Sequence, residues 1–275
     1  MSDKSDKAVK LEDRLRVDPG SKVKLRDADA DDTHGYTKET ATAKTARDLD
    51  RLTSLQERIY AENKQSVLIV LQGIDAAGKD GSIRHVMSAF NPQGCTVTGF
   101  GVPSAVEASH DHLWRIHLAA PAKREIGIFN RSHYESVLVV RVHNLVPKAR
   151  WEAAFDEINA FESLLAGAGT TILKFFLHIS KAEQAARLKA RYDDPTKHWK
   201  FNVGDLAERK LWDDYMTAYQ DALTRCSTDA APWYVIPADH KWFRNLALGE
   251  IVADRLDALK PAYPTVELPK DLVIS

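Results

Sequence analysis

A glycine-rich segment with one lysine is the part of this chain whose residue types most directly indicate chemistry. The segment from Gly73 to Lys79, GIDAAGK, has the spacing G-x-x-x-x-G-K, which is typical of loops that bind phosphate. Glycines let several backbone N–H groups turn towards one anion, and the lysine adds a full positive charge. We expect phosphate to bind at Gly73, Ala76, Ala77, Gly78, Lys79, Asp80 and Gly81.

Two acidic residues distinguish this loop from the usual motif. A Ser or Thr that helps to bind magnesium normally follows the lysine, but here Asp80 occupies that position, and Asp75 lies inside the loop. A carboxylate beside phosphate is repulsive unless a cation lies between them. We therefore predict that Asp75 is a ligand of Mg²⁺, with Mn²⁺ as an alternative, and that Asp80 is a second candidate ligand. The pattern indicates a phosphate site that differs from that of an ordinary ATPase.

A second polar segment follows the apolar stretch Glu125–Asn130. Arg131 comes directly after it, and Ser132, His133 and Glu135 lie in the next few positions. Polar residues at the carboxyl end of a strand line the ligand crevice of an open α/β sheet. A guanidinium can hold two phosphate oxygens at once, so Arg131 is the strongest candidate for a catalytic cation outside the loop. Ser132 and His133 are explained equally well as a helix cap and a packed helix start.

A third candidate region is basic. Between Lys174 and Lys200 the chain has seven Lys or Arg residues and three Asp or Glu residues. In small phosphoryl-transfer enzymes a mobile segment brings such cations over the phosphates and excludes water. The alternative is a solvated helix face without function.

The elements that must position these residues alternate along the chain. Apolar stretches predict buried strands at Val67–Leu71, Cys95–Phe100, Glu125–Asn130, Thr170–Ile179 and Trp233–Ile236. Helical spacing of apolar residues predicts helices between them, at Thr40–Asn63, Ile83–Phe90, Trp151–Leu165, Lys181–Tyr192, Asp205–Leu223 (with Leu206 facing inward) and His240–Leu259. This alternation is typical of an α/β fold with a parallel sheet.

A further helix is expected after Ser104. Ser104 and Glu107 have the spacing of a capping box, and the helix would carry the chain through Arg115. Histidines at positions 110, 112 and 117 suggest a metal site, but their spacing does not place all three on one helical face, so we do not assign one.

Length and composition set further limits. The chain has 275 residues and a net charge of −1, which gives no indication of nucleic acid as a partner. Cys95 and Cys226 lack the spacing of a disulfide framework or a zinc site. No apolar run approaches the length of a membrane span and no signal peptide is evident, so a cytoplasmic protein without membrane contact is expected.

We expect a single domain at residues 39–265 that includes a lid at about 182–210. Residues 1–38 are predicted to form an extended arm across the domain or a partner subunit, and residues 266–275 a tail.

The order of several motifs resembles polyphosphate kinase family 2 from about residue 18 to 265. The motifs are GIDAAGKDGSIR, FGVPS, LWRIH, IGIFNRSHYESVLVVRVHNLVP, ILKFFLHISKAEQAARL, DPTKHWKF, WDDY and PWYVIPA. The resemblance implies a three-layer α/β/α P-loop kinase core like that of thymidylate kinase, with a helical lid, assembled as a homodimer or homotetramer. It also implies transfer of phosphoryl groups from inorganic polyphosphate to nucleotides. The FNRSHYE motif resembles the class III branch, which is associated with both nucleoside mono- and diphosphates as acceptors.

The resemblance also assigns roles to residues. Asp75, Lys79 and Arg131 match positions that hold magnesium and the transferring phosphoryl group, and Asn130 and Glu135 match positions linked to acceptor choice. Polyphosphate binding is expected at Arg84 and at the lid residues Arg187, Arg191, Lys197 and Lys200. Nucleotide binding is expected at Phe100, Val102, Pro103, Asn130 and Arg131. Ala77 and Ser136 depart from the family pattern, where some relatives have Gly and Asp, and Ser136 affects the expected magnesium or base contacts.

Two other functions remain open. An ATP-dependent kinase of nucleotides or small molecules could use the same core, and a phosphate sensor could bind polyphosphate without turnover. The density of charged residues around the loop favours catalysis over sensing. A GTPase is disfavoured because the chain lacks an Asn-Lys-x-Asp guanine motif.

Overall fold

The computed structural model describes residues 10–268 and contains a five-stranded sheet in the order β2-β3-β1-β4-β5. The strands are β1 (Ser66–Gln72), β2 (Cys95–Gly99), β3 (Ile126–Asn130), β4 (Thr170–His178) and β5 (Trp233–Pro237), and all neighbours pair in parallel. Every residue of β1 is buried, as expected of a central parallel strand covered on both faces. The strands therefore follow the predicted apolar stretches closely.

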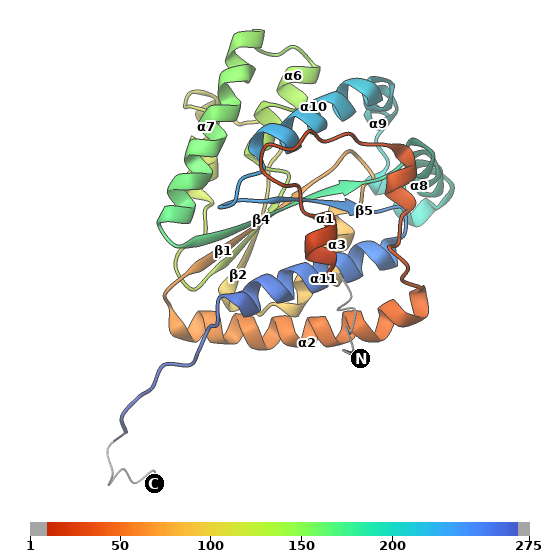
Figure 1. The fold of residues 1–275 in the computed structure, drawn as a ribbon. Coiled ribbons are helices and arrows are strands. Elements are labelled where there is room, and N and C mark those ends of the chain that lie inside the picture. The colour runs from red at the N-terminus through yellow and green to blue at the C-terminus, as the bar shows by residue number, and fades with distance from the viewer. Residues whose placement is uncertain (1–9, 269–275) are drawn as a thin grey trace, which may run out of the picture.

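Helices cover both faces of the sheet (Figure 1). On one face lie α2 (Lys38–Glu62), α3 (Lys79–His85) and α11 (Lys241–Ala258), and on the other lie α6 (Val139–Val142), α7 (Lys148–Gly167) and α10 (Trp212–Cys226). Helix α11 packs along α2 and against β5, which buries an unbroken run of its residues from 246 to 253. The arrangement confirms the predicted three-layer α/β/α fold.

The described part of the N-terminal arm lies on the edge of the sheet beside β5. Helix α1 (Leu11–Leu15) buries Leu11 and Leu15, and the amide of Val17 donates to the Trp233 carbonyl at 2.8 Å. A 3₁₀ helix, η1 (Asp27–Asp31), follows before α2. Residues 10–37 are thus partly helical rather than extended throughout, and they lie on the domain of their own chain.

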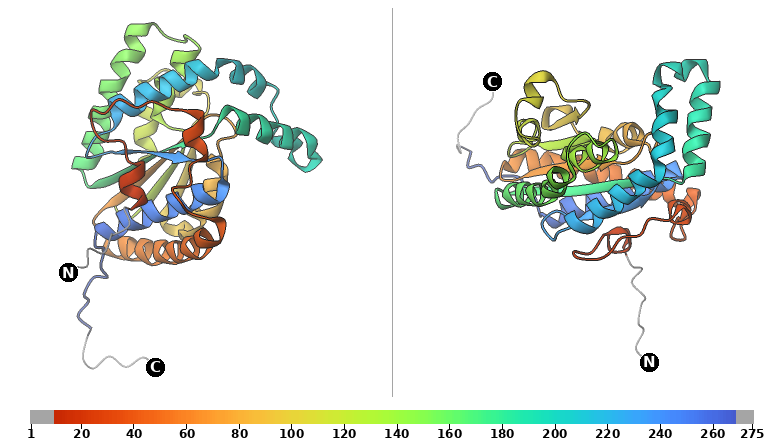
Figure 2. Two further views of the ribbon diagram at one scale, coloured as in Figure 1. Left: turned by 45° about the vertical axis from the view of Figure 1, so that its right-hand side comes forward. Right: turned by 90° about the horizontal axis from the view of Figure 1, so that it is seen from above.

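A helical segment extends beyond the carboxyl end of the sheet, where Figure 2 shows it as the teal hairpin. It consists of α8 (Lys181–Asp193), η5 (Pro195–Lys200), α9 (Gly204–Glu208) and η6 (Arg209–Leu211). The Ser180 side chain accepts from the Glu183 amide and caps α8. We call this segment the lid.

Three predicted helices are shorter than expected. The helix expected at 205–223 is divided into α9, η6 and α10, and Leu206, predicted to face inward, is 46% exposed. Arg209 in η6 donates to the Lys181 carbonyl and the Gln184 side chain. These two hydrogen bonds connect η6 to the beginning of α8 at the base of the lid.

The helix expected after Ser104 is also divided, into α4 (Ala105–Ala108) and α5 (Trp114–Leu118). The Ser104–Glu107 capping box is confirmed. The chain leaves the helix because the Asp111 side chain accepts from the Leu113 amide at 2.9 Å, and such a local turn competes with helical hydrogen bonds. Helix α3 ends at His85, and the 3₁₀ segments η2 (Met87–Ala89), η3 (Pro92–Gly94) and η4 (His133–Ser136) complete the described elements.

None of the helices within residues 10–268 has the length and apolar character needed to cross a membrane.

Candidate active site

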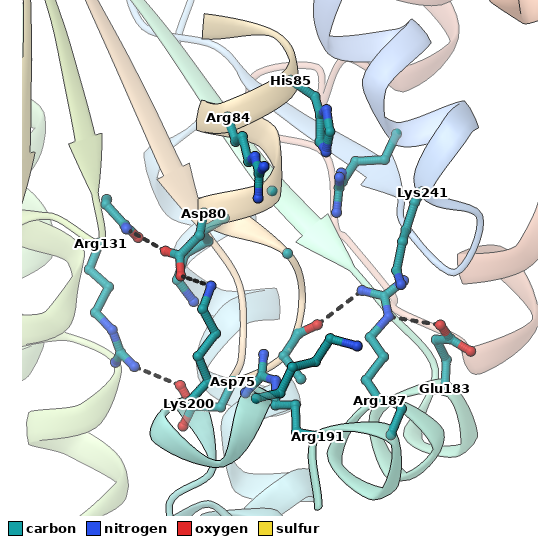
Figure 3. Close-up of a pocket in the computed structure, with 18 of the residues that line it drawn as sticks. Asp75, Asp80, Arg84, His85, Arg131, Glu183, Arg187, Arg191, Lys200 and Lys241 are labelled. Atoms are coloured by element: carbon teal, nitrogen blue, oxygen red, sulfur yellow. Dashed lines mark hydrogen bonds and ion pairs between the residues drawn. The ribbon is translucent and has the colours of Figure 1, made fainter. Parts of the chain in front are cut away.

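A cavity of about 890 Å³ opens where β1 and β3 end. The loop after β1, helix α3, lid helix α8 and the beginning of α11 form its walls, and cationic side chains project into it from several of these elements (Figure 3). The cavity lies at the carboxyl edge of a parallel sheet, which is where ligands bind in open α/β folds.

The glycine-rich loop connects β1 to α3 with a tightly curved backbone. Gly78 has φ +111°, a conformation that favours glycine. A Cβ atom at this position would also lie 2.0 Å from Nη1 of Arg244. Gly78 is therefore required both by its dihedral angle and by the close approach of an arginine.

Lys79, at the first position of α3, is buried within this loop. Its Nζ donates to the carbonyl oxygens of Gly73 at 2.6 Å and Ile74 at 3.3 Å. Burial, together with the nearby Arg131, lowers the pKa of Lys79 to about 8. The hydrogen-bond acceptors of this lysine are neutral carbonyls. A bound phosphate would therefore stabilise its positive charge.

Arg131 meets two carboxylates at the edge of the cavity. Its Nη2 donates to Asp75 Oδ1 at 2.7 Å, and its Nη1 lies 3.6 Å from Glu135 Oε2. Although burial opposes the charge, Glu135 and Asp75 together raise the pKa of Arg131. Burial raises the pKa of Glu135, and Arg131 and Lys79 partly offset this. The structure therefore brings Asp75, Lys79, Arg131 and Glu135 together as predicted.

Asp80, the second candidate magnesium ligand, makes a different set of contacts. Asn130 Nδ2 donates to its Oδ1 at 2.9 Å, and Nζ of the lid residue Lys200 lies 3.9 Å from its Oδ2 (Figure 3). The carboxylate thus connects the end of β3 to the lid.

All three guanidinium nitrogens of Arg187, in α8, donate hydrogen bonds within the protein. Its Nε donates to Glu183, Nη1 donates to the carbonyls of Ala76 and Ala77, and Nη2 donates to those of Ala238 and Asp239. It lines the cavity, but its five N–H groups are already bonded. Arg187 was expected to bind polyphosphate, but its hydrogen bonds in this structure stabilise the glycine-rich loop instead.

Arg244 in α11 was not predicted as a site residue. It is 2% exposed and lines the cavity, and its only side-chain hydrogen-bond partner within residues 10–268 is Asn245. Burial and the neighbouring Arg187 lower its pKa to about 10. Lys241 and His85 line the same cavity. A signal was present in the sequence, because two cations three residues apart begin α11, where the helix dipole disfavours positive charge.

The remaining predicted residues divide into two groups. The first group lines the cavity and comprises Ala76, Gly78, Gly81, Arg84, Phe100, Asn130, Arg191 and Lys197. The second group does not line it. Val102, which is 96% exposed, and Pro103 lie outside the cavity. Gly73 and Ala77 lie within the loop, and Gly73 lines a smaller cavity beside Glu135. Ser132 caps the turn by accepting from the Tyr134 amide and His133 is buried, which agrees with their structural interpretation.

The residues present fit one mode of magnesium binding. Within residues 10–268, no three His, Cys, Asp or Glu side chains gather to form a metal cage. Mg²⁺ commonly binds instead through one or two carboxylates, phosphate oxygens of the substrate and water. Asp75 lines the cavity with a carboxylate, so it fits that mode.

Comparison with known proteins agrees with this geometry. The model of the family Polyphosphate kinase 2 (PPK2) matches residues 35–264. The chain belongs to the polyphosphate kinase 2 family. It is 49% identical over 263 residues to an AMP/ADP-polyphosphate phosphotransferase of Meiothermus ruber, covering 95% of this chain and 98% of that protein.

Two further members show the same likeness. An ADP-polyphosphate phosphotransferase of Rhodopseudomonas palustris is 47% identical, with 78% of this chain and 79% of that protein covered. The crystal structure of polyphosphate kinase 2 from Arthrobacter aurescens TC1 superposes with a TM-score of 0.91 at 44% identity, covering 95% of this chain and 94% of that one. The likeness therefore extends over the core and the lid alike.

Proposed function

We propose that this protein transfers phosphoryl groups from inorganic polyphosphate to nucleoside mono- and diphosphates, converting AMP or ADP to ADP or ATP with Mg²⁺. The observation that carries the proposal is the convergence of cations from the loop, the lid and α11 on one cavity, in a chain whose net charge is −1. A polymer of phosphates has no base or sugar, so recognition requires cations at intervals. The names of the relatives supply the substrate class.

The reaction needs positioning and charge neutralisation more than acid–base chemistry. The bond between the terminal phosphoryl group and the polymer breaks as a bond to an acceptor phosphate oxygen forms. That oxygen is already an anionic nucleophile, so no general base is required. The transition state is loose and strongly anionic, and Lys79 and Arg131 would stabilise its charge. Mg²⁺ held by Asp75 would neutralise phosphate oxygens when bound.

The cavity offers two sides for the two substrates. Figure 3 shows Arg131 and Lys241 on opposite sides. We assign the polymer to the side formed by Arg84, Lys241 and Arg244, and the acceptor nucleotide to the side of Asn130 and Arg131. The lid cations Arg191, Lys197 and Lys200 would cover the phosphates. Assembly as a homodimer or homotetramer and a cytoplasmic location stay predictions.

A substitution in the loop tests the proposal. Lys79→Ala should cost on the order of 3 kcal/mol of transition-state stabilisation, a loss of about 100-fold or more in turnover. The assay combines protein, Mg²⁺, polyphosphate and AMP or ADP, and follows nucleotides by chromatography. Lys64→Ala, which removes a lysine with a 74% exposed side chain paired to Glu62, is the matched control and should retain activity.

Each alternative function has its own outcome in this assay. Turnover with ATP but none with polyphosphate would favour an ATP-dependent kinase. Tight polyphosphate binding without transfer to any acceptor would favour a sensor. Near wild-type turnover by Lys79→Ala would contradict the assignment of the loop.

A further inference from the structure

A buried ionic cluster adjoins the turn that follows Arg131, and the proposed reaction does not use it. Nζ of Lys174, in the middle of β4, donates to Glu162 Oε2 at 2.5 Å and to the Tyr134 hydroxyl at 2.8 Å. Glu162 Oε1 accepts from that hydroxyl at 2.9 Å and lies 3.0 Å from His133 Nε2. All four side chains are at most 2% exposed.

Stability alone does not account for this cluster. Moving two ions out of water has a large cost, and well-packed apolar residues commonly serve stability as well as a buried ion pair does. Burial favours the neutral form of Glu162, but Lys174 and His133 outweigh it and hold the pKa of Glu162 below its ordinary value. A carboxylate kept ionised in the core is a strong acceptor with fixed directions, which suits the positioning of its partners.

The partners of Glu162 belong to a turn under conformational strain. Arg131 has φ +64°, a left-handed conformation that costs on the order of 1–3 kcal/mol and persists only where the surroundings impose it. His133 and Tyr134 follow it and both reach Glu162. On the other side of the turn, Gln72 Nε2 at the end of β1 donates to Ser132 Oγ at 3.0 Å and to Glu135 Oε1 at 3.2 Å.

We propose that Glu162 is a positioning residue: through His133 and Tyr134 it holds the turn that aims Arg131 into the active site, and Lys174 fixes its carboxylate. The proposal rests on the role that the proposed function gives to Arg131. Glu162 does not line the cavity, so its effect on the reaction passes entirely through the turn. The rigid sheet thereby supports a cation located on a strained loop.

The test removes the hydrogen bonds of His133 and Tyr134 to Glu162, together with the bond from Lys174 to the Tyr134 hydroxyl, while keeping an aromatic ring at both positions. The variant His133→Phe/Tyr134→Phe should lower kcat for polyphosphate-driven phosphorylation of AMP or ADP on the order of 10- to 100-fold, because small displacements of a catalytic group have effects of this size. The KM for polyphosphate should stay within about twofold, because the polymer is assigned to the side of the cavity opposite Arg131. Unchanged kcat in the folded variant would overturn the proposal.

A double-mutant cycle separates positioning from general destabilisation. In an Arg131→Ala background the same two substitutions should change the residual rate by less than about twofold, because the group they position is absent. An equal loss in both backgrounds would overturn the proposal while leaving the role of Arg131 intact. If Arg131→Ala itself kept wild-type activity, the proposed function of Arg131 would fail as well.

Two further variants keep the test decisive. Tyr234→Phe is the matched control, because Tyr234 is also fully buried and its hydroxyl donates to a glutamate, Glu12, at 3.2 Å, far from the turn along the chain. It should leave kcat unchanged. If the double variant does not fold, as judged by thermal unfolding, Tyr134→Phe alone is carried through the same cycle, with a smaller loss of the same pattern expected.

Discussion

Two arginines flank Gly78 in the glycine-rich loop, and they differ in the partners of their hydrogen bonds. Arg187 and Arg244 are both buried, at 8% and 2% exposure, and their Nη1 atoms lie 3.6 Å and 2.0 Å from where a Cβ of Gly78 would be. The donors of Arg187 all end on Glu183 and four backbone carbonyls. Within the part of the chain that the structure describes, those of Arg244 reach only Asn245. Arg187 therefore builds the site, whereas Arg244 is available to a ligand.

This difference shows that burial and charge do not by themselves identify a ligand-binding cation. A guanidinium carries five N–H donors, and accounting for each of them separates the two roles. A buried arginine with bonded donors is structural, and its removal leaves carbonyls without partners. A buried arginine with unused donors in a cavity indicates an anionic ligand, because an uncompensated buried charge is costly.

The largest expected effect comes from Arg187. Arg187→Met should lower the free energy of unfolding by about 3–5 kcal/mol, because several buried carbonyls and Glu183 lose their partner at once. Urea unfolding measures the change. Arg150→Met, which breaks an exposed ion pair with Glu157, is the control and should cost less than about 1 kcal/mol. A small loss at Arg187 would mean that the loop holds its conformation without the arginine.

Arg244 should show the opposite behaviour. Arg244→Met should leave the free energy of unfolding unchanged or raise it, because it removes a buried charge that has no carboxylate partner among residues 10–268. It should lower kcat/KM for polyphosphate by about 10- to 100-fold, through the loss of charge-assisted hydrogen bonds worth roughly 1.5–3 kcal/mol. Steady-state kinetics and urea unfolding on the same preparation test both statements. A loss of stability without a change in kcat/KM would reverse the distinction between the two arginines.

Sequence could predict the parts of this site that are local in the chain. The loop, the strand before it and Arg131 at the end of β3 all follow from short patterns, because each depends on neighbours within a few residues. The sheet follows from strands such as β1, which is buried on both faces. The division of the helix expected after Ser104 was missed because the Asp111 side chain bonds a nearby amide in place of continued helical structure.

The roles of the two arginines depend on distant segments. Arg187 bonds carbonyls at 76–77 and at 238–239, which only the folded chain brings together. Arg244 lies in a helix whose pattern of apolar residues indicates packing, and nothing local shows that its first turn adjoins Gly78. The buried pair of Glu162 and Lys174 is equally non-local, because it joins a helix to the sheet.

Lys79 is intermediate between the two arginines, since two neutral carbonyls hold it. Its pKa in the folded protein is about 8, below that of an unfolded chain, so Lys79 is half deprotonated near pH 8 and mostly neutral above about pH 9. kcat/KM for polyphosphate should then fall about tenfold per pH unit, because the free enzyme loses the charge that we propose binds phosphate. A pH–rate profile measures this. Lys79→Arg, which stays charged, should move the decline to higher pH, and an unchanged profile would contradict the assignment.

Stability should respond to pH in the opposite direction. Between about pH 8 and the ordinary lysine pKa near 10.5, the unfolded chain binds the proton of Lys79 more tightly than the folded chain. The contribution of this group to the free energy of unfolding therefore rises with pH across that interval. Falling activity with rising stability separates the titration of Lys79 from alkaline unfolding, which would lower both.

The smallest effect is expected at the lid, where a cation is neither buried nor fully bonded. Lys200 lies 3.9 Å from Asp80, and the two side chains are 38% and 71% exposed. Solvent screens such a pair, so Lys200→Ala should change the free energy of unfolding little. It should lower kcat/KM for polyphosphate by less than about fivefold, and the loss should shrink further in high salt. A loss as large as that of Arg244→Met would show that the lid cation becomes desolvated when polymer binds, and that its exposure in this structure understates its role.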